Sequence, residues 1–490
     1  MPPTINELPP ELLEELVDAC TTYPKRDQSK TMATLRALSQ TSSTFRPICQ
    51  SKLFSTITIL TEYDEYVEDT NPLDRLYELF VESDRLAQYA THLTILNKRF
   101  NRQSGPFADD EDKTHRDGEH TLTKLLTLLQ THSRLEQFTV VSIWPSRHHY
   151  GYHRNPGRCM ALMKAIMETF KMPSLVRVNM KDMPLDLFRF CTPNVKHLAL
   201  WDASVEWDLP EEDKMQAPIG EKIQLESLVM YSSSLGSENL VMEEIIDSEF
   251  LDLSGVRKLS VGLEHCRMVE KMHGQVAQLL ERCSSSLEEL SLTPSTVCMS
   301  LSVTLFLLYV HSQILHVASI FLAFDLGHDP PLGPESITFA SLKSLRALHL
   351  GIQTGLCEDY QGNNHEPIPW LCSVLNTLPR PNVLESLTIS SGYGQLAGGN
   401  GGSYWGVNFD DYAQLDVLLG EWKVPKLKKV RWFIEESKFL LTKFDKNYTT
   451  PGEFSKRAKW VVINIHGKMP QMRRKKKLEF EFGACTFMLN

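Results

Sequence analysis

Four copies of one six-residue unit decide the fold: VKHLAL at 195–200, LESLVM at 225–230, VRKLSV at 256–261 and LEELSL at 287–292. Each copy has apolar residues at its first, fourth and sixth positions, with mostly polar residues between them. The first residues of the copies are 30, 31 and 31 positions apart. Alternation of this kind is typical of a β-strand, and a fixed period of this size indicates a repeat architecture.

The same unit continues on both sides of this stretch. LEQFTV at 135–140 and LVRVNM at 175–180 precede it, and LRALHL at 345–350, LESLTI at 384–389 and LKKVRW at 427–432 follow it. The step from Leu287 to Leu345 is 58 residues, close to two periods, and the weaker LHVASI at 315–320 divides it. We therefore expect a further strand there, and HLTIL at 92–96 predicts an additional first strand.

Segments between the units have the apolar spacing of helices, at 121–129, 160–170, 268–280 and 370–378. Strands that alternate with helices at a fixed period pair in parallel, with every crossover on the same side. This predicts an α/β solenoid with a curved parallel sheet at 61–440. The unit resembles the leucine-rich repeat, in its irregular ribonuclease-inhibitor-like variety, over roughly residues 90–435, although the Asn or Cys that usually follows is missing. An ordinary α/β domain is the alternative.

In a leucine-rich repeat the first, fourth and sixth positions face the core, and the positions between them face solvent on the concave side. Solenoids use such a surface to bind other proteins. The resemblance therefore implies an unidentified protein substrate held by side chains of both signs: Lys196, His197, Glu226, Arg257, Lys258, Glu288, Glu289, Arg346 and His349. A solvated sheet face without a ligand is the alternative for each of them.

Residues 1–60 do not fit the repeat and predict three short helices. Pro9 and Pro10 suit a first helical turn, and the acidic residues that follow complement the helix dipole. Leu8, Leu12, Leu13, Leu16 and Val17 then form an apolar stripe. A second helix carries Leu35 and Leu38, a third carries Phe45, Ile48 and Phe54, and the strand-like TITIL closes the segment. So small a unit exposes apolar surface that a partner can cover.

The patterns LPPELLEEL at 8–16, TLRALSQTS at 34–42 and RPICQSKLFSTITI at 46–59 resemble an F-box. The resemblance implies docking to the Skp adaptor of an SCF-type ubiquitin ligase, and through it to the cullin scaffold. By that pattern the adaptor-binding residues are Leu8, Pro9, Leu12, Leu16, Leu35 and Leu38, while Phe45, Ile48 and Phe54 brace the module. The polar segment at 21–30 is longer than usual in the family. A helical cap for the solenoid is the alternative.

An F-box followed by leucine-rich repeats implies a substrate-recognition subunit of the ligase. The alternative is a leucine-rich-repeat scaffold that binds a protein and has no ligase role. Three parts are expected: the F-box module at 1–60, the solenoid at 61–440 and a basic capping segment at 441–490.

Charge supports protein recognition. The net charge is −10, so nucleic acid is not an expected partner, since phosphate contacts need clustered Lys and Arg. Residues 421–490 hold 17 Lys and Arg against 7 Asp and Glu, which leaves a net −20 on residues 1–420. Within the basic part, RRKKK at 473–477 is interpreted as a solvated turn, with an import signal or a phosphate-binding patch as alternatives.

No catalytic residue, metal or cofactor is expected, because no motif provides the required set of groups. The histidines at 148–153 lack a nearby carboxylate or cysteine at ligand spacing, and the glycines at 392–406 lack the Lys of a phosphate-binding loop. The ten cysteines are scattered and indicate reduced thiols. The apolar stretch 301–324 has polar residues at its centre, which disfavours a membrane span. A cytoplasmic or nuclear location is expected.

Overall fold

The computed structural model describes residues 8–21, 28–60, 72–96, 112–141, 160–201, 203, 221–232, 238–264, 269–295, 337–353, 367–393, 410–420, 424–436 and 462–484. Contacts within the chain divide it into two compact units. The first unit comprises Met1–Val195 with Asp208–Ile219, and the second comprises Lys196–Trp207 with Gly220–Asn490.

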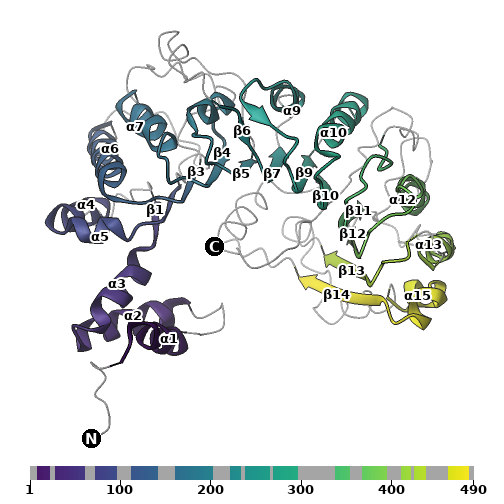
Figure 1. Ribbon diagram of the computed structural model, residues 1–490, viewed down its shortest axis with the longest axis horizontal. Helices are drawn as coiled ribbons and strands as arrows, with labels where there is room; N and C mark the ends of the chain where they lie inside the picture. Colours follow the sequence, from purple (N-terminus) through teal and green to yellow (C-terminus); the bar gives the residue numbers. More distant parts are fainter. Residues whose placement is uncertain are drawn as a thin grey trace, which may run out of the picture. The chain divides into compact units, whose positions relative to one another are not determined.

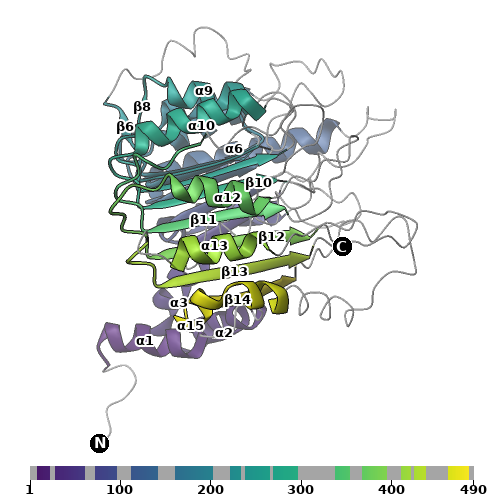
Figure 2. The same cartoon turned by 90° about the vertical axis from the view of Figure 1, so that its right-hand side faces the viewer.

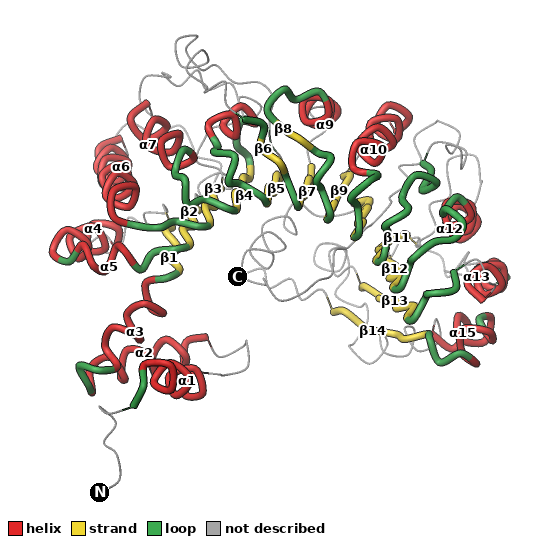
Figure 3. The backbone as a smooth tube through the Cα atoms, in the orientation of Figure 1, coloured by secondary structure: helices red, strands yellow, loops and turns green. Residues whose placement is uncertain are grey.

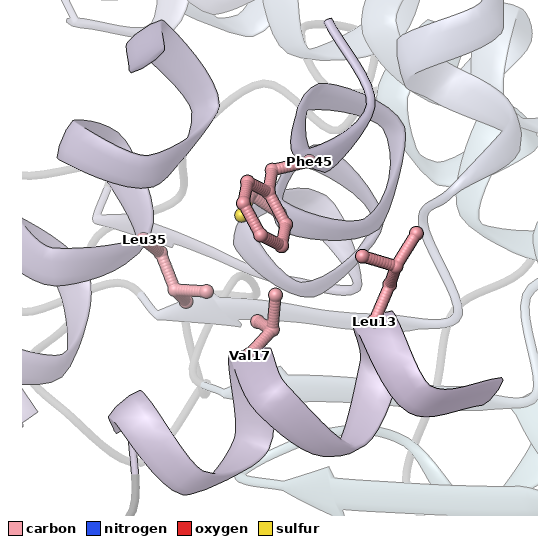
Figure 4. Packing of buried hydrophobic residues seen from close by; sticks show 5 residues of the cluster. Leu13, Val17, Leu35 and Phe45 are labelled. Carbon is pink, nitrogen blue, oxygen red and sulfur yellow. The ribbon is translucent and has the colours of Figure 1, made fainter. Parts of the chain in front are cut away.

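The first unit begins with three helices, as predicted: α1 (Pro10–Thr21), α2 (Gln28–Thr41) and α3 (Phe45–Phe54). We call these helices the N-terminal module. Pro10 opens α1 and Glu11 lies in its first turn, where a missing N–H and a negative charge both suit a helix start. The module has a small core of its own, made by Leu13, Val17, Leu35, Phe45 and Cys49. Figure 4 shows four of these side chains converging from the three helices.

The rest of the first unit is a parallel sheet covered by helices. Its strands are β1 (Thr56–Leu60), β2 (His92–Leu96), β3 (Gln137–Val141) and β4 (Arg177–Lys181), adjacent in that order. The connections hold α4 (Pro72–Glu82), α5 (Asp84–Gln88), α6 (Asp112–His132) and α7 (Met160–Phe170), and the 3-10 helix η5 (Leu185–Phe190) follows β4. Figure 3 shows α4–α7 on one side of these strands. Phe138 of β3 meets Phe170 of α7 edge to face, with ring centres 5.3 Å apart.

The second unit repeats this plan over eight parallel strands. In sheet order they are β5 (His197–Trp201), β7 (Ser227–Ser232), β9 (Lys258–Glu264), β10 (Glu289–Ser295), β11 (Ala347–Gln353), β12 (Ser386–Tyr393), β13 (Lys429–Glu436) and β14 (Leu478–Ala484). Its helices are α9 (Glu238–Ile246), α10 (Val269–Cys283), α12 (Pro367–Asn376), α13 (Asp411–Gly420) and α15 (Pro470–Arg474). A separate parallel pair is formed by β6 (Ile223–Gln224) and β8 (Leu251–Asp252). In Figures 1 and 2 the helices of this unit lie on one face of its parallel strands.

The repeat predicts these strands well. Every six-residue unit named above, except the one at 315–320, contributes a strand to a parallel sheet, and TITIL and HLTIL are β1 and β2. The first, fourth and sixth positions face the core, as in Leu287, Leu290 and Leu292, which are all buried. The predicted α/β class with a parallel sheet is therefore confirmed.

β10 bonds directly to β11, with Leu290 opposite Leu348, so the sheet has no strand between these two. The strand expected at 315–320 and the whole apolar stretch 301–324 fall within residues 296–336, which lie outside the described residues. At the other end, β14 extends the sheet into residues assigned from the sequence to a capping segment. No helix among the described residues is long and apolar enough to span a membrane.

Candidate functional site

Four apolar residues of α1 divide into two pairs that face different ways. Leu13 and Val17 are 4% and 0% exposed and lie in the module core. Leu12 and Leu16 are 47% and 40% exposed. Residues four apart lie above one another on a helix, so each pair forms its own short stripe. Two exposed leucines thus stand side by side on the outer surface of α1, next to the exposed Pro9 and Pro10.

The other residues expected to bind the adaptor lie deeper. Leu35 is 4% exposed and packs inside the module, so its side chain belongs to the module core, and its contact with the adaptor stays a prediction. Its place on α2 turns it toward Leu13 and Val17, as Figure 4 shows. Leu8 and Leu38 are partly buried against the same core. The outer face of the module is therefore centred on Leu12 and Leu16.

The residues expected to brace the module hold α3 in place. Phe45 is buried in the module core, and Ile48 packs against it. Phe54, at the end of α3, meets Phe80 of α4 edge to face with ring centres 6.0 Å apart. Arg85 Nη2 of α5 also donates a 2.7 Å hydrogen bond to Gln50 Oε1 of α3. These contacts join the module to the first helices of the sheet.

In the second unit, a row of alternating charges crosses the starts of the strands. The row occupies the second position of successive repeats: Lys196, Glu226, Arg257, Glu288, Arg346, Glu385 and Lys428. Backbone hydrogen bonds join each member to the next, from the N–H of each later residue to the carbonyl of the one before, at 2.8–2.9 Å. We call this series the charge row. Its spacing is that of neighbouring strands.

Ion pairs join members of this row and of the next position along the strands. Arg257 donates to Glu288 Oε1 through Nε at 3.0 Å and through Nη2 at 2.8 Å. Glu385 lies between Arg346, at 3.9 Å, and Lys428, whose hydrogen bond lowers the pKa of the Glu385 carboxyl. One residue further on, Lys258 meets Glu289 at 3.0 Å and Lys429 meets Glu479 at 2.5 Å. The face presents charges of both signs that are largely matched within the chain.

The remaining predicted residues of this face differ in exposure. Lys196 and His197 are half-buried, and Glu226 is exposed. His349 is only 6% exposed, so the expectation that it faces solvent is wrong. It lies between Ser291 of β10 and Thr388 of β12 in register. Burial, with the Arg431 charge adding to it, lowers the pKa of His349 to about 3. His349 is thus a neutral side chain of the interior.

One acidic residue that the sequence did not single out organises the last repeats. Asp416 of α13 is 2% exposed and accepts hydrogen bonds from the backbone N–H groups of Gln471 and Met472, at 2.8 and 2.9 Å. These are N–H groups of the first turn of α15, which have no partner within that helix. A buried carboxylate from the preceding repeat therefore caps α15. Asp416 falls in an apolar helical stretch, which is the only signal the sequence offers for it.

The described residues offer little reactive chemistry. Among them, no three His, Cys, Asp or Glu side chains are grouped to hold a metal ion, and Cys20, Cys49, Cys191, Cys283 and Cys372 are free thiols. Burial raises the pKa of Cys283 to about 12 and that of Cys372 to about 11, so these thiols behave as small apolar side chains. The histidines at 148–153 and most of the glycine-rich segment lie outside the described residues.

The sequence matches no protein-family model, and it has no match among curated proteins.

Proposed function

We propose that the chain is the substrate-recognition subunit of an SCF-type ubiquitin ligase. Its N-terminal module docks to the Skp adaptor, which links it to the cullin scaffold, and its repeats, which resemble leucine-rich repeats, hold a protein substrate. The observation that carries the proposal is the outward pair Leu12 and Leu16 on a three-helix module that already has a core. The sequence resemblance of that module to an F-box supplies the identity of the partner.

The energetics favour a partner on this face. Covering a leucine side chain completely contributes about 1.5–3 kcal/mol, so covering the exposed half of Leu12 contributes about 1 kcal/mol, and Leu16 contributes a similar amount. Together they correspond to roughly a thirtyfold change in affinity. The module core is small, which limits how much apolar surface three helices can hide by themselves.

The mechanism is proximity rather than chemistry at this chain. A receptor that holds a substrate while its other end is docked to the ligase raises the effective concentration of the substrate near the ubiquitin-charged enzyme. The division into an N-terminal helical module and a long parallel sheet suits two separate binding tasks. The mixed-sign face with the charge row is suited to reading a protein surface, since solenoids present such faces to their partners.

The test compares two double variants of the full chain. Leu12→Asp/Leu16→Asp places charges on the outward face, and Val81→Asp/Val176→Asp is the matched control, because those valines are 58% and 39% exposed in the same unit. Binding to the purified Skp adaptor is measured by calorimetry, and circular dichroism checks folding. We expect the first variant to bind at least about thirtyfold more weakly and the control to bind as the wild type does.

Two results would overturn the proposal. Undiminished binding by Leu12→Asp/Leu16→Asp would remove these residues from the interface. Absence of adaptor binding by the folded wild type would favour the scaffold without a ligase role, with the three helices acting as a cap.

A further inference from the structure

The alternation of the charge row does not continue beyond Lys428. The row ends at Lys428, two residues before Val430, and Val430 begins the pairing of β13 with β14 opposite Leu478. The residue two positions before Leu478 is Lys476, in the turn that precedes β14, so no carboxylate stands at the position that would continue the row. Every earlier step of the row brings a cation beside a carboxylate, so this repeat departs from the rule that the rest of the unit follows.

Lys476 also occupies a backbone position that favours glycine. Its φ is 52°, in the left-handed region. The backbone N–H of Lys477 donates to the carbonyl of Met472 at 3.1 Å, and the backbone N–H of Lys476 donates to the carbonyl of Arg473 at 2.9 Å. These two bonds form the Schellman motif that closes α15, in which the residue at this position is usually glycine. A lysine here carries a conformational cost that glycine would not, and such costs are concentrated at functional sites.

Two lysine side chains of the run RRKKK form hydrogen bonds with neighbouring repeats, and the other three cations do not. Lys475 Nζ donates to the carbonyl of Gly420 at the end of α13, at 2.5 Å, and Lys477 Nζ donates to the carbonyl of Leu427. Arg473, Arg474 and Lys476 are exposed, and within the part of the chain that the structure describes their side chains form no hydrogen bond or ion pair. The predicted turn is present at Lys475 and Lys476, whereas Arg473 and Arg474 are the last residues of α15. We call Arg473, Arg474 and Lys476 the basic cluster.

We propose that the basic cluster, Arg473, Arg474 and Lys476, docks an acidic segment of a protein partner. The partner supplies the carboxylates that the alternation of the charge row lacks at this repeat. Carboxylate recognition by the same geometry is present in the chain, where Arg257 donates two hydrogen bonds to Glu288 on the neighbouring repeat. The proposal does not depend on the ligase role, since it concerns the opposite end of the chain.

Other polyanions fit the cluster less well. Single-stranded nucleic acid needs aromatic side chains on which its bases stack, and the aromatic residues of β13 and β14 whose burial is described, Trp432 and Phe480, are buried and half-buried. Anionic membranes are recognised by about four to eight free cations, more than this cluster offers. Glu479, which is 51% exposed and pairs with Lys429, adds a negative charge close by. Three cations beside a carboxylate suit a short acidic peptide better.

The test uses the full chain and a fluorescently labelled peptide in which Asp and Glu alternate with Ser. Binding is measured by anisotropy at a Debye length of about 10 Å and again at about 3 Å. The comparison probes are the same peptide with Asn and Gln, a single-stranded oligonucleotide and vesicles that contain phosphatidylserine. The variant is Arg473→Ser/Arg474→Ser/Lys476→Gly, and the control is Lys343→Ser, which removes an exposed cation from the turn before β11.

We expect the wild type and Lys343→Ser to bind the acidic peptide equally, with affinity lost at high salt. The triple variant should bind at least about tenfold more weakly, since each exposed charge contact contributes a factor of up to about five. Lys476→Gly alone should keep or raise the melting temperature, which separates loss of binding from loss of folding.

Three outcomes would refute the proposal. The first is equal peptide binding by the triple variant, and the second is tighter binding of the oligonucleotide or the vesicles than of the acidic peptide. The third is a triple variant that aggregates while still binding the peptide. In that case the cations protect the edge of β14, the last strand in the sheet order, from pairing with other chains.

Discussion

The division of α1 into an inner and an outer pair of apolar residues predicts that replacement by alanine destabilises the module strongly at the inner pair and only slightly at the outer pair. Leu13→Ala removes a side chain that is 4% exposed and packs among Val17, Leu35, Phe45 and Cys49. Buried leucine-to-alanine changes cost about 2–5 kcal/mol, from lost burial and from the cavity that remains. We expect about 3 kcal/mol here, because the core is small and its helices can partly close the gap.

Replacing the outer pair, Leu12 and Leu16, by alanine should lower the stability of the module far less. Leu12 and Leu16 are almost half exposed, so replacing each by alanine removes only part of a buried surface and leaves no enclosed cavity. Alanine also has the higher helix propensity, which offsets some of the loss. Leu12→Ala/Leu16→Ala should therefore lower the stability of the module by less than about 1 kcal/mol.

Hydrogen exchange read by mass spectrometry measures this difference in the full chain, because it reports the local opening of α1–α3 separately from the sheet. Amides of the module should exchange much faster in Leu13→Ala than in the wild type. In Leu12→Ala/Leu16→Ala their exchange rates should be nearly the same as in the wild type. A double variant that loses as much protection as Leu13→Ala would show that the outer leucines are structural. The argument from exposure to an interface would then fail.

Two further predictions follow from buried polar groups of the second unit. Asp416→Ala should destabilise the last repeat by about 1–3 kcal/mol, because two backbone N–H groups of α15 lose their acceptor, and exchange of the α15 amides measures it. His349 has a lowered folded pKa, so the unfolded chain takes up a proton below about pH 6.5 while the folded chain does not, and stability falls as the pH drops toward 3. Urea titrations of wild type and His349→Gln at pH 7 and pH 5 should show a loss that is about 2 kcal/mol smaller in the variant; equal losses would contradict it.

Much of the fold is predictable because the repeat fixes both the strands and their faces. A six-residue unit with three inward positions specifies where a strand starts and which side chains enter the core, and the structure follows it from Leu135 to Trp432. The strand expected at 315–320 lies outside the described residues, and β10 and β11 form hydrogen bonds directly with each other.

The candidate sites were less predictable. Periodicity gives the direction in which a side chain leaves its own helix or strand, but it does not say which other element packs against that side chain. Leu12, Leu13 and Leu16 all belong to one apolar stripe in the sequence, and only the positions of α2 and α3 decide which of them is covered. Leu35 is expected from the resemblance to meet the adaptor, and its burial depends in the same way on the positions of α1 and α3. The expectation that His349 faces solvent is wrong, because the second face of a sheet is exposed only where no other part of the chain covers it.

The alternating charges of the charge row favour pairing of each repeat with its proper neighbour. Strands with nearly the same pattern could pair with the next repeat but one, since the apolar positions would still match. That error would bring Glu226 beside Glu288 and Arg257 beside Arg346, so every contact of the row would join like charges. Each exposed pair contributes only a few tenths of a kcal/mol to about 1 kcal/mol, but the native order forms six steps of opposite charge and the shifted order forms none. The difference of a few kcal/mol is comparable with a good part of the stability of a domain. Alternation therefore selects the neighbour, and the repeat that departs from it, at Lys476, leaves positive charge that the described residues do not neutralise.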